Sequence, residues 1–142
     1  MTKRLPASAP RLPVTDCVLD ASAIVALLRR ETGCERVAEL VSDPAASMST
    51  VNLSEVVAKL AEDGLTAGTV RESIDRLQLK AIPFDAEAAF QAGFLRPLTR
   101  HLGLSLGDRA CLALAQRLGL PAVTADRSWT ALQLPVTVQV IR

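Results

Sequence analysis

Short apolar runs alternate with amphipathic segments along most of this chain, and this alternation restricts the possible folds more than any other feature. The runs are only a few residues long, whereas the segments between them space their apolar residues three and four positions apart, as helices do. Strands that alternate with helices favour a mostly parallel sheet covered by helices on both faces. We therefore expect an α/β fold with three layers and a four- to five-stranded, mostly parallel sheet.

The pattern predicts strands at residues 15–19, 45–48, 81–83, 122–124 and 136–141. It predicts helices at residues 21–30, 34–41, 51–62, 67–79, 85–96 and 106–118, with a short helical turn before the last strand. Gly64, Pro97 and Gly119 are expected to end three of these helices. In the helix at 51–62, the inward face is predicted to carry Leu53, Val56, Val57, Leu60 and Ala61.

The start of the chain differs in composition from the rest. Three prolines within residues 1–14 predict a flexible leader, so the domain is expected to occupy residues 15–142. Residues 1–15 carry three basic side chains and no acid, which leaves 13 basic and 15 acidic side chains for the remainder. That body is close to neutral, unlike a protein that binds nucleic acid mainly by charge. If the substrate is RNA, metal ions must supply much of the positive charge.

The three cysteines, Cys17, Cys34 and Cys111, are widely spaced and form no paired motif. An odd number without pairing predicts free thiols, buried at Cys17 and Cys111, and a reducing compartment. The apolar stretch at residues 23–28 is far too short to span a bilayer. The prolines near the start also interrupt any signal-peptide core. We therefore expect a cytoplasmic protein.

Four acids occupy special positions in this arrangement. Asp20 follows the first strand, Glu55 lies in the first turn of the helix after the second, Asp108 opens a later helix, and Asp126 follows the strand at 122–124. Sites in parallel sheets lie beyond the carboxyl ends of the strands, where these acids would converge. Clustered carboxylates repel one another unless a cation is present, and Mg²⁺ prefers oxygen ligands. The sequence thus predicts a metal site. It needs no histidine, and His101, the single histidine, lies in an expected loop.

Each acid also has a structural alternative, because acids at helix N-termini commonly cap them. The candidate caps are Asp20 before Ala21, Glu55 in a capping box with Asn52, Asp108 with Ser105, and Asp126 before the turn at residues 127–129. Capping and metal binding are compatible, so only the joint arrangement favours a functional site.

Four segments resemble the motifs of PIN-domain nucleases, and together they extend the resemblance over residues 15–142. They are Val18-Leu19-Asp20-Ala21-Ser22-Ala23, Ser49-Thr50-Val51-Asn52-Leu53-Ser54-Glu55-Val56, the run from Leu104 to Ala115 around Gly107-Asp108, and Val123-Thr124-Ala125-Asp126-Arg127-Ser128-Trp129. In size and motif wording the chain is most similar to VapC-type toxins of bacterial toxin–antitoxin pairs. Where many relatives have a phenylalanine after the fourth motif, this chain has Trp129, which we expect to pack in the core.

The resemblance implies a three-layer PIN-like fold and an endoribonuclease that depends on Mg²⁺ or Mn²⁺. It implies that Asp20 and Asp108 are the principal metal ligands and that Glu55 and Asp126 complete the site. Ser22 would orient Asp20, and Thr124 would form a hydrogen bond near Asp126. Arg109 and Arg127, each next to a site acid, are candidates for contacts with RNA phosphates. The implied partners are an RNA substrate, with tRNA the first to test, a cognate antitoxin protein and a second copy of the chain.

Two other functions stay open at this point. An aspartyl-nucleophile phosphatase usually needs a second acid two residues after the first, where this chain has Ser22. A non-catalytic RNA-binding or regulatory module would not need the complete acid set. The helices at 51–62 and 67–79 are rich in Leu, Val and Ala, so they are candidate surfaces for the dimer or the antitoxin. An antitoxin could also insert an Arg or Lys among the acids.

Overall fold

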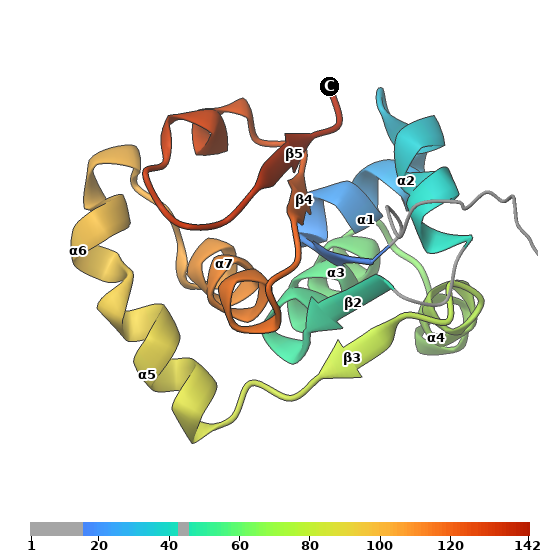
Figure 1. Ribbon diagram of the computed structural model, residues 1–142. Coiled ribbons are helices and arrows are strands. Elements are labelled where there is room, and N and C mark those ends of the chain that lie inside the picture. The colour runs from blue at the N-terminus through green and yellow to red at the C-terminus, as the bar shows by residue number, and fades with distance from the viewer. Residues whose placement is uncertain (1–15, 43–45) are drawn as a thin grey trace, which may run out of the picture.

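A computed structural model describes residues 16–42 and 46–142, so the expected leader at residues 1–14 lies outside the described part of the chain. Five strands form one sheet in the order β3-β2-β1-β4-β5 (Figure 1). They are β1 (Cys17–Leu19), β2 (Ala46–Ser49), β3 (Lys80–Ile82), β4 (Ala122–Thr124) and β5 (Val138–Val140). All four pairings are parallel, which confirms the expected sheet.

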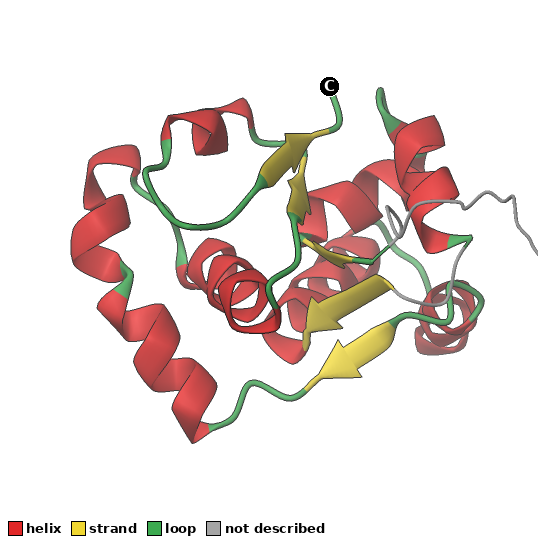
Figure 2. Cartoon of the chain, viewed as in Figure 1, coloured by secondary structure: helices red, strands yellow, loops and turns green. Residues whose placement is uncertain are grey.

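Helices cover both faces of this sheet, so the fold has three layers (Figure 2). They are α1 (Ala21–Arg29), α2 (Cys34–Val41), α3 (Thr50–Glu62), α4 (Ala67–Asp75), α5 (Ala86–Phe94), α6 (Arg96–Thr99) and α7 (Leu106–Leu118), with 3₁₀ helices η1 (Arg100–Leu102) and η2 (Arg127–Ala131). None of the helices in the described ranges is both long and apolar enough to cross a membrane.

Two hydrophobic cores lie on opposite faces of the sheet. Successive side chains of a strand point to opposite faces, so Cys17 and Leu19 of β1 enter one core and Val18 enters the other. The first core includes residues of α1, α2, α3 and α4, and the second includes residues of α5, α7 and η2. Because all three β1 side chains are fully buried, β1 is the centre of the fold, and the residue that follows it is held firmly.

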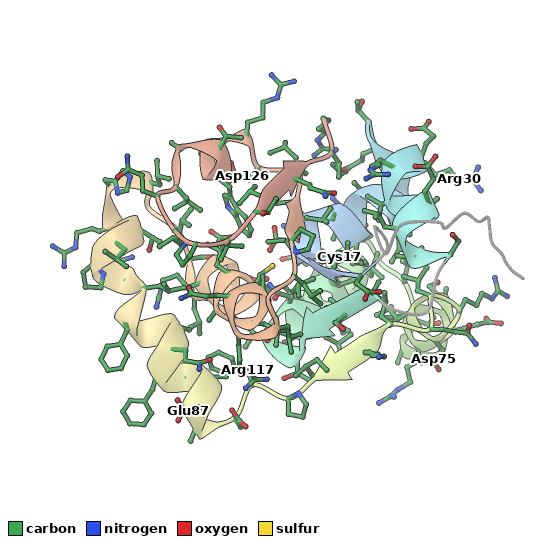
Figure 3. All side chains as sticks on the ribbon, in the orientation of Figure 1. Cys17, Arg30, Asp75, Glu87, Arg117 and Asp126 are labelled. Atoms are coloured by element: carbon green, nitrogen blue, oxygen red, sulfur yellow. The ribbon has the colours of Figure 1, made fainter. Side chains whose placement is uncertain are left out.

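The cysteines have the environment that the sequence predicts. All three are free, and Cys17 and Cys111 are buried. Figure 3 shows Cys17 in the interior. Burial raises the pKa of the Cys17 thiol to about 11 and that of Cys111 well above its ordinary value. Both thiols therefore stay protonated near neutral pH, as inert core residues do.

The inward face of α3 differs from the expected one. Asn52, Val56 and Leu60 are buried, each four positions from the next, whereas Val57 is 39% exposed and Ala61 is exposed. Val57 and Ala61 instead line a groove that α3 shares with α4. The buried stripe is therefore rotated toward Asn52, a polar residue that the apolar pattern passes over.

Two helix ends were also wrong in the prediction. Pro97 does not stop the helical path, because it lies in the first turn of α6, where its missing N–H costs nothing. The helix expected at 67–79 ends at Asp75, and Gln78 adopts a left-handed backbone conformation with φ of 53°. Such a residue cannot continue a right-handed helix.

Candidate active site

The carboxyl edge of the sheet gathers side chains from four elements. Asp20 follows β1, α3 begins directly after β2, and Thr124 ends β4. Parallel strands end on one edge, so these residues meet there, and the first turn of α7 contacts α3 beside them. The result is a pocket of about 370 Å³, lined by Asp20, Ala21, Ser22, Glu55, Ala58, Lys59, Glu62 and Asp108. The structure thus brings three of the four predicted site acids together.

Asp20 is 4% exposed, and two hydroxyls fix the direction of its carboxylate. Ser22 Oγ donates to Asp20 Oδ2 at 2.7 Å, and Thr124 Oγ1 donates to the same oxygen at 3.1 Å. Each hydroxyl also accepts a backbone N–H, Ser22 from Ala125 at 2.9 Å and Thr124 from Asp126 at 3.1 Å. Because an N–H can only donate, these contacts leave both hydroxyl protons available for Asp20 Oδ2, and the two hydroxyls also lie 3.2 Å from each other. The predicted contact between Ser22 and Asp20 is therefore present.

Burial raises the pKa of Asp20 to about 6, and the nearby charges of Asp108 and Glu55 add to this rise. The hydrogen bonds from Ser22 and Thr124 act in the opposite direction, since they stabilise the ionised carboxylate. A carboxylate that is buried beside two others carries an unfavourable charge, which a bound cation would relieve.

Glu55 is half-buried, and its carboxylate lies directly against the α carbon of Gly107. A β carbon at position 107 would overlap the carboxylate, so a larger residue there would require the Glu55 side chain to move. The capping role suggested for Glu55 is wrong: Ser49 caps α3 by accepting from the N–H of Val51, and Asn52 lies inside the helix. Burial raises the pKa of Glu55 as well, and the charge of Asp108 adds to the rise.

Asn52 is fully buried between the acids, and its role was missed in the sequence. Its Nδ2 donates to Glu55 Oε1 and to the Gly107 carbonyl, both at 3.0 Å, and lies 3.5 Å from Asp20 Oδ1. A signal for it existed, because Asn52 lies four and eight residues before Val56 and Leu60, on the same helical face.

Asp108 and Asp126 both act as caps in this structure. Asp108 accepts from the N–H of Ser105 at 2.9 Å in a reciprocal capping box, yet it also lines the pocket. Asp126 accepts from the N–H of Ser128 at 2.9 Å and is exposed. Asp126 is not among the residues that line the pocket, and Figure 3 shows it near the turn beyond β4. Its part in metal binding therefore stays a prediction.

Within residues 16–42 and 46–142, no three His, Cys, Asp or Glu side chains are arranged as a ready set of metal ligands. The two capping acids account for this, because their carboxylates are turned toward backbone N–H groups. Mg²⁺ commonly binds through one or two carboxylates and several waters. Asp20 and Glu55, with Asp108 at the same pocket, fit that requirement.

The basic residues near the site differ from expectation. Arg109 is half-buried and donates to the Ala92 carbonyl at 3.0 Å, so it ties α7 to α5, and its RNA contact stays a prediction. Arg127 is exposed and donates to the Arg142 carbonyl at 2.9 Å, and its RNA contact stays a prediction. Lys59, not considered from the sequence, is the one basic residue among the described residues that line the pocket. Trp129 is 1% exposed, which confirms its place in the core.

Comparisons with known proteins agree with this architecture. The PIN domain family model matches residues 17–133. Solved structures with a similar fold include a chain of VapBC2 from Rickettsia felis bound to a promoter DNA fragment, with 16% identity, a TM-score of 0.67, and coverage of 87% of this chain and 97% of that one. A chain of a toxin–antitoxin complex from Klebsiella pneumoniae is 18% identical, with a TM-score of 0.69 and coverage of 89% of this chain and 98% of that one. A chain of DNA-bound VapBC from Salmonella typhimurium is 19% identical, with a TM-score of 0.67 and the same two coverages. No curated protein matches the sequence.

At these identities the structural likeness concerns the fold alone, whereas the family model spans most of the chain. Strands β1 to β4 and the acids at the carboxyl edge of the sheet lie within the matched residues, and β5 follows them. The chain belongs to the PIN domain family.

Proposed function

We propose that the protein is an endoribonuclease that depends on Mg²⁺ or Mn²⁺ and hydrolyses RNA phosphodiesters. The observation that carries this proposal is the meeting of Asp20, Glu55 and Asp108 at one pocket, where burial and mutual repulsion disfavour their charges. Such a cluster is costly without a cation. PIN domains are generally nucleases, and the first, second and third motifs supply these three acids.

The residues of the pocket have distinct tasks in this proposal. Asp20 and Glu55 would hold the cation, with Asp108 beside them and Asp126 as the predicted fourth acid. A bound divalent ion would polarise the phosphoryl oxygen and lower the pKa of water. Ser22 and Thr124 keep Asp20 Oδ2 in a fixed direction, so that oxygen need not reorient when substrate binds. Lys59 at the rim can attract an RNA phosphate.

The direct test is to incubate the purified protein with tRNA and Mn²⁺. Asp20→Asn and Asp108→Asn remove site acids, and Asp75→Asn, which changes an exposed acid on α4, is the matched control. We expect cleavage by the wild type and by the Asp75 variant, and loss of cleavage in both site variants. Equal cleavage by all four proteins would contradict the assignment, and RNA binding without cleavage by the wild type would favour the non-catalytic module.

We further propose that the nuclease is the toxin of a toxin–antitoxin pair in the cytoplasm. Support comes from the structural relatives, which belong to VapBC and toxin–antitoxin complexes. The free, buried cysteines suit a reducing compartment. A surface for the antitoxin is available in a groove of about 420 Å³ between α3 and α4, lined mainly by apolar side chains that include Leu53, Val57, Ala61, Val70 and Ile74. These are the two helices that the sequence marked as unusually apolar.

The homodimer is proposed on a different surface. Phe90, Phe94 and Leu98 are 64%, 73% and 57% exposed and follow one another at intervals of four along α5 and α6. Glu87 precedes this stripe in the chain, and Arg100 follows it. A second copy placed antiparallel would therefore bring opposite charges together.

One pair of variants separates the two surfaces. Val57→Lys changes the groove and Phe94→Lys changes the stripe, and both positions are exposed, so neither variant buries the new charge. After co-expression with the product of a short neighbouring reading frame, we expect the Val57 variant to lose the antitoxin but remain dimeric. The Phe94 variant should become monomeric, as measured by sedimentation. If both variants behave like the wild type, neither surface has its proposed role.

A further inference from the structure

Asn52 is the side chain that links the acids of the pocket to one another. Its single Nδ2 group contacts acceptors from three elements: Asp20 after β1, Glu55 on α3 and the Gly107 carbonyl on α7. All three are oxygens that can only accept when the acids are ionised, so this end of the amide must be the nitrogen. The orientation of the amide is therefore set by the acids around it.

The other end of the same amide is unpaired. Asn52 Oδ1 is buried and has no hydrogen-bond donor among the described residues. A buried acceptor without a donor destabilises the folded state. The rest of this helical face is apolar, with Val56 and Leu60 next along it. An aliphatic residue would suit that face better, so folding stability alone gives little reason for asparagine here.

The contact with Gly107 does not supply that reason either. Gly107 lies in the first turn of α7, and its carbonyl can accept the helical N–H four residues later without help from Asn52. The bonds that remain are those to the two carboxylates. Two like charges held close together repel each other, and a shared N–H donor reduces this repulsion.

We propose that Asn52 is a positioning residue that holds the carboxylates of Asp20 and Glu55 together so that they can share one divalent cation. An amide suits this task because it stabilises both carboxylates while leaving their negative charge in place. A lysine or arginine at the same point would neutralise that charge and compete with the cation. The inference rests on the proposed metal-dependent function, because it assigns Asn52 a role toward that cation.

The experiment measures Mn²⁺ binding by isothermal titration calorimetry and the free energy of unfolding by urea, both on the full chain. Asn52→Leu removes the donor and the unpaired oxygen, and Asn52→Ala does so without adding bulk should leucine prevent folding. We expect Mn²⁺ affinity to fall about 10- to 100-fold, as is usual when a group that orients a metal ligand is lost. The leucine variant should be no less stable than the wild type.

Val56→Ala is the matched control on the same buried face. It truncates the core and lowers stability but touches neither carboxylate, so its Mn²⁺ affinity should equal that of the wild type. A weaker affinity in this variant, in step with its stability, would show that Asn52 acts only through the fold. That result would overturn the inference.

A double-mutant cycle with Glu55→Gln measures the coupling between Asn52 and Glu55 in Mn²⁺ binding, which a purely structural role of Asn52 would not produce. If Asn52 acts by holding the Glu55 carboxylate, then Asn52→Ala should weaken Mn²⁺ binding less in the Glu55→Gln background than in the wild type. Additive effects would contradict the mechanism. If the wild type binds Mn²⁺ and the folded Asn52 variants bind it equally well, this inference is overturned and the proposed function is not. Wild-type protein that binds no Mn²⁺ would overturn the proposed function and, with it, this inference.

Discussion

Asp20 is nearly fully buried, and its carboxylate lies in the negative potential of Glu55 and Asp108. Burial raises the pKa of Asp20 from 3.8 to about 6. The folded state therefore binds its proton more tightly than the unfolded state does. The contribution of Asp20 to stability is most favourable below pH 4 and declines as the pH rises toward 6, because the unfolded chain loses this proton first.

This sign leads to a prediction for Asp20→Asn. In EDTA at pH 7, the substitution should raise the free energy of unfolding by up to about 3 kcal/mol, since each unit of pKa shift corresponds to about 1.4 kcal/mol. Near pH 4 the gain should largely disappear. Urea unfolding at both pH values measures the difference. Asp126→Asn, at an exposed acid, is the control and should change stability little at either pH. A destabilised Asp20→Asn at pH 7 would contradict the raised pKa.

Gly107 provides a second prediction at the residue scale. In Gly107→Ala the new methyl group would overlap the Glu55 carboxylate and turn it away from Asp20. Mn²⁺ affinity, measured by calorimetry, should fall by about tenfold or more. Gly68→Ala on α4 is the matched control, because nothing lies within 4 Å of the added methyl. That variant should keep its Mn²⁺ affinity and gain about 0.5–1 kcal/mol in stability. Equal affinities in the two variants would show that the packing of Glu55 against Gly107 has no role.

The site residues differ in how far the sequence could specify them. Asp20 and Asp108 stand at element ends that the hydrophobic pattern marks, so their approach could be predicted. Asn52 was assigned to a helix cap because asparagine is common there, but Ser49 takes the capping position. The observed cap lies three residues before Asn52, so Asn52 lies on the buried face of α3 and not at its end. Hydrophobic periodicity does not define a boundary that closely.

On the scale of elements, α3 contributes to two surfaces at once. Its buried stripe carries Asn52 toward the acids, and the adjacent side carries Val57 and Ala61 into the groove with α4. The apolar residues of α3 could not be divided between core and groove from the pattern, since both surfaces need the same residue types. Likewise, a proline can follow the end of one helix or lie in the first turn of the next. Here Pro97 lies in the first turn of α6.

Lys59 lies one turn after Glu55 on α3, at the rim of the pocket, which leads to a prediction about RNA binding. For Lys59→Ala we expect KM for tRNA to rise roughly two- to fivefold with little change in kcat, because an exposed charge contact contributes about 0.2–1 kcal/mol. Steady-state cleavage in Mn²⁺ measures both constants. Lys80→Ala, which removes an exposed lysine on β3, should leave KM unchanged. A loss confined to kcat would instead place Lys59 at the chemical step.

Over the whole molecule, the alternation of strands and helices was enough to predict the parallel sheet and the edge at which the acids meet. It could not give the strand order β3-β2-β1-β4-β5, because each crossover is compatible with more than one neighbour. It also could not show that the side chains of Asp108 and Asp126 turn toward backbone N–H groups. That orientation depends on local hydrogen bonds. The residue types allow these hydrogen bonds, but they do not require them.

The charge of the whole molecule bears on the proposed binding of RNA. Residues 16–142 carry 13 basic and 15 acidic side chains, and one basic residue lines the described pocket. Few phosphates could therefore be neutralised by the protein itself, so the proposed function requires a divalent cation to offset most of the repulsion. We predict that adding Ca²⁺, which prefers the same oxygen ligands as Mg²⁺, raises RNA affinity by at least about tenfold over EDTA.

The same reasoning predicts a shallow dependence on salt. Each phosphate contact on single-stranded nucleic acid contributes about −0.7 to the slope of log K against log salt, so one or two contacts give a slope no steeper than about −1.5. Fluorescence anisotropy with labelled RNA at several KCl concentrations measures the slope. A steep slope with equal affinity in EDTA and Ca²⁺ would mean that RNA binds an arginine-rich surface elsewhere. The acids would then contribute to catalysis but not to RNA binding.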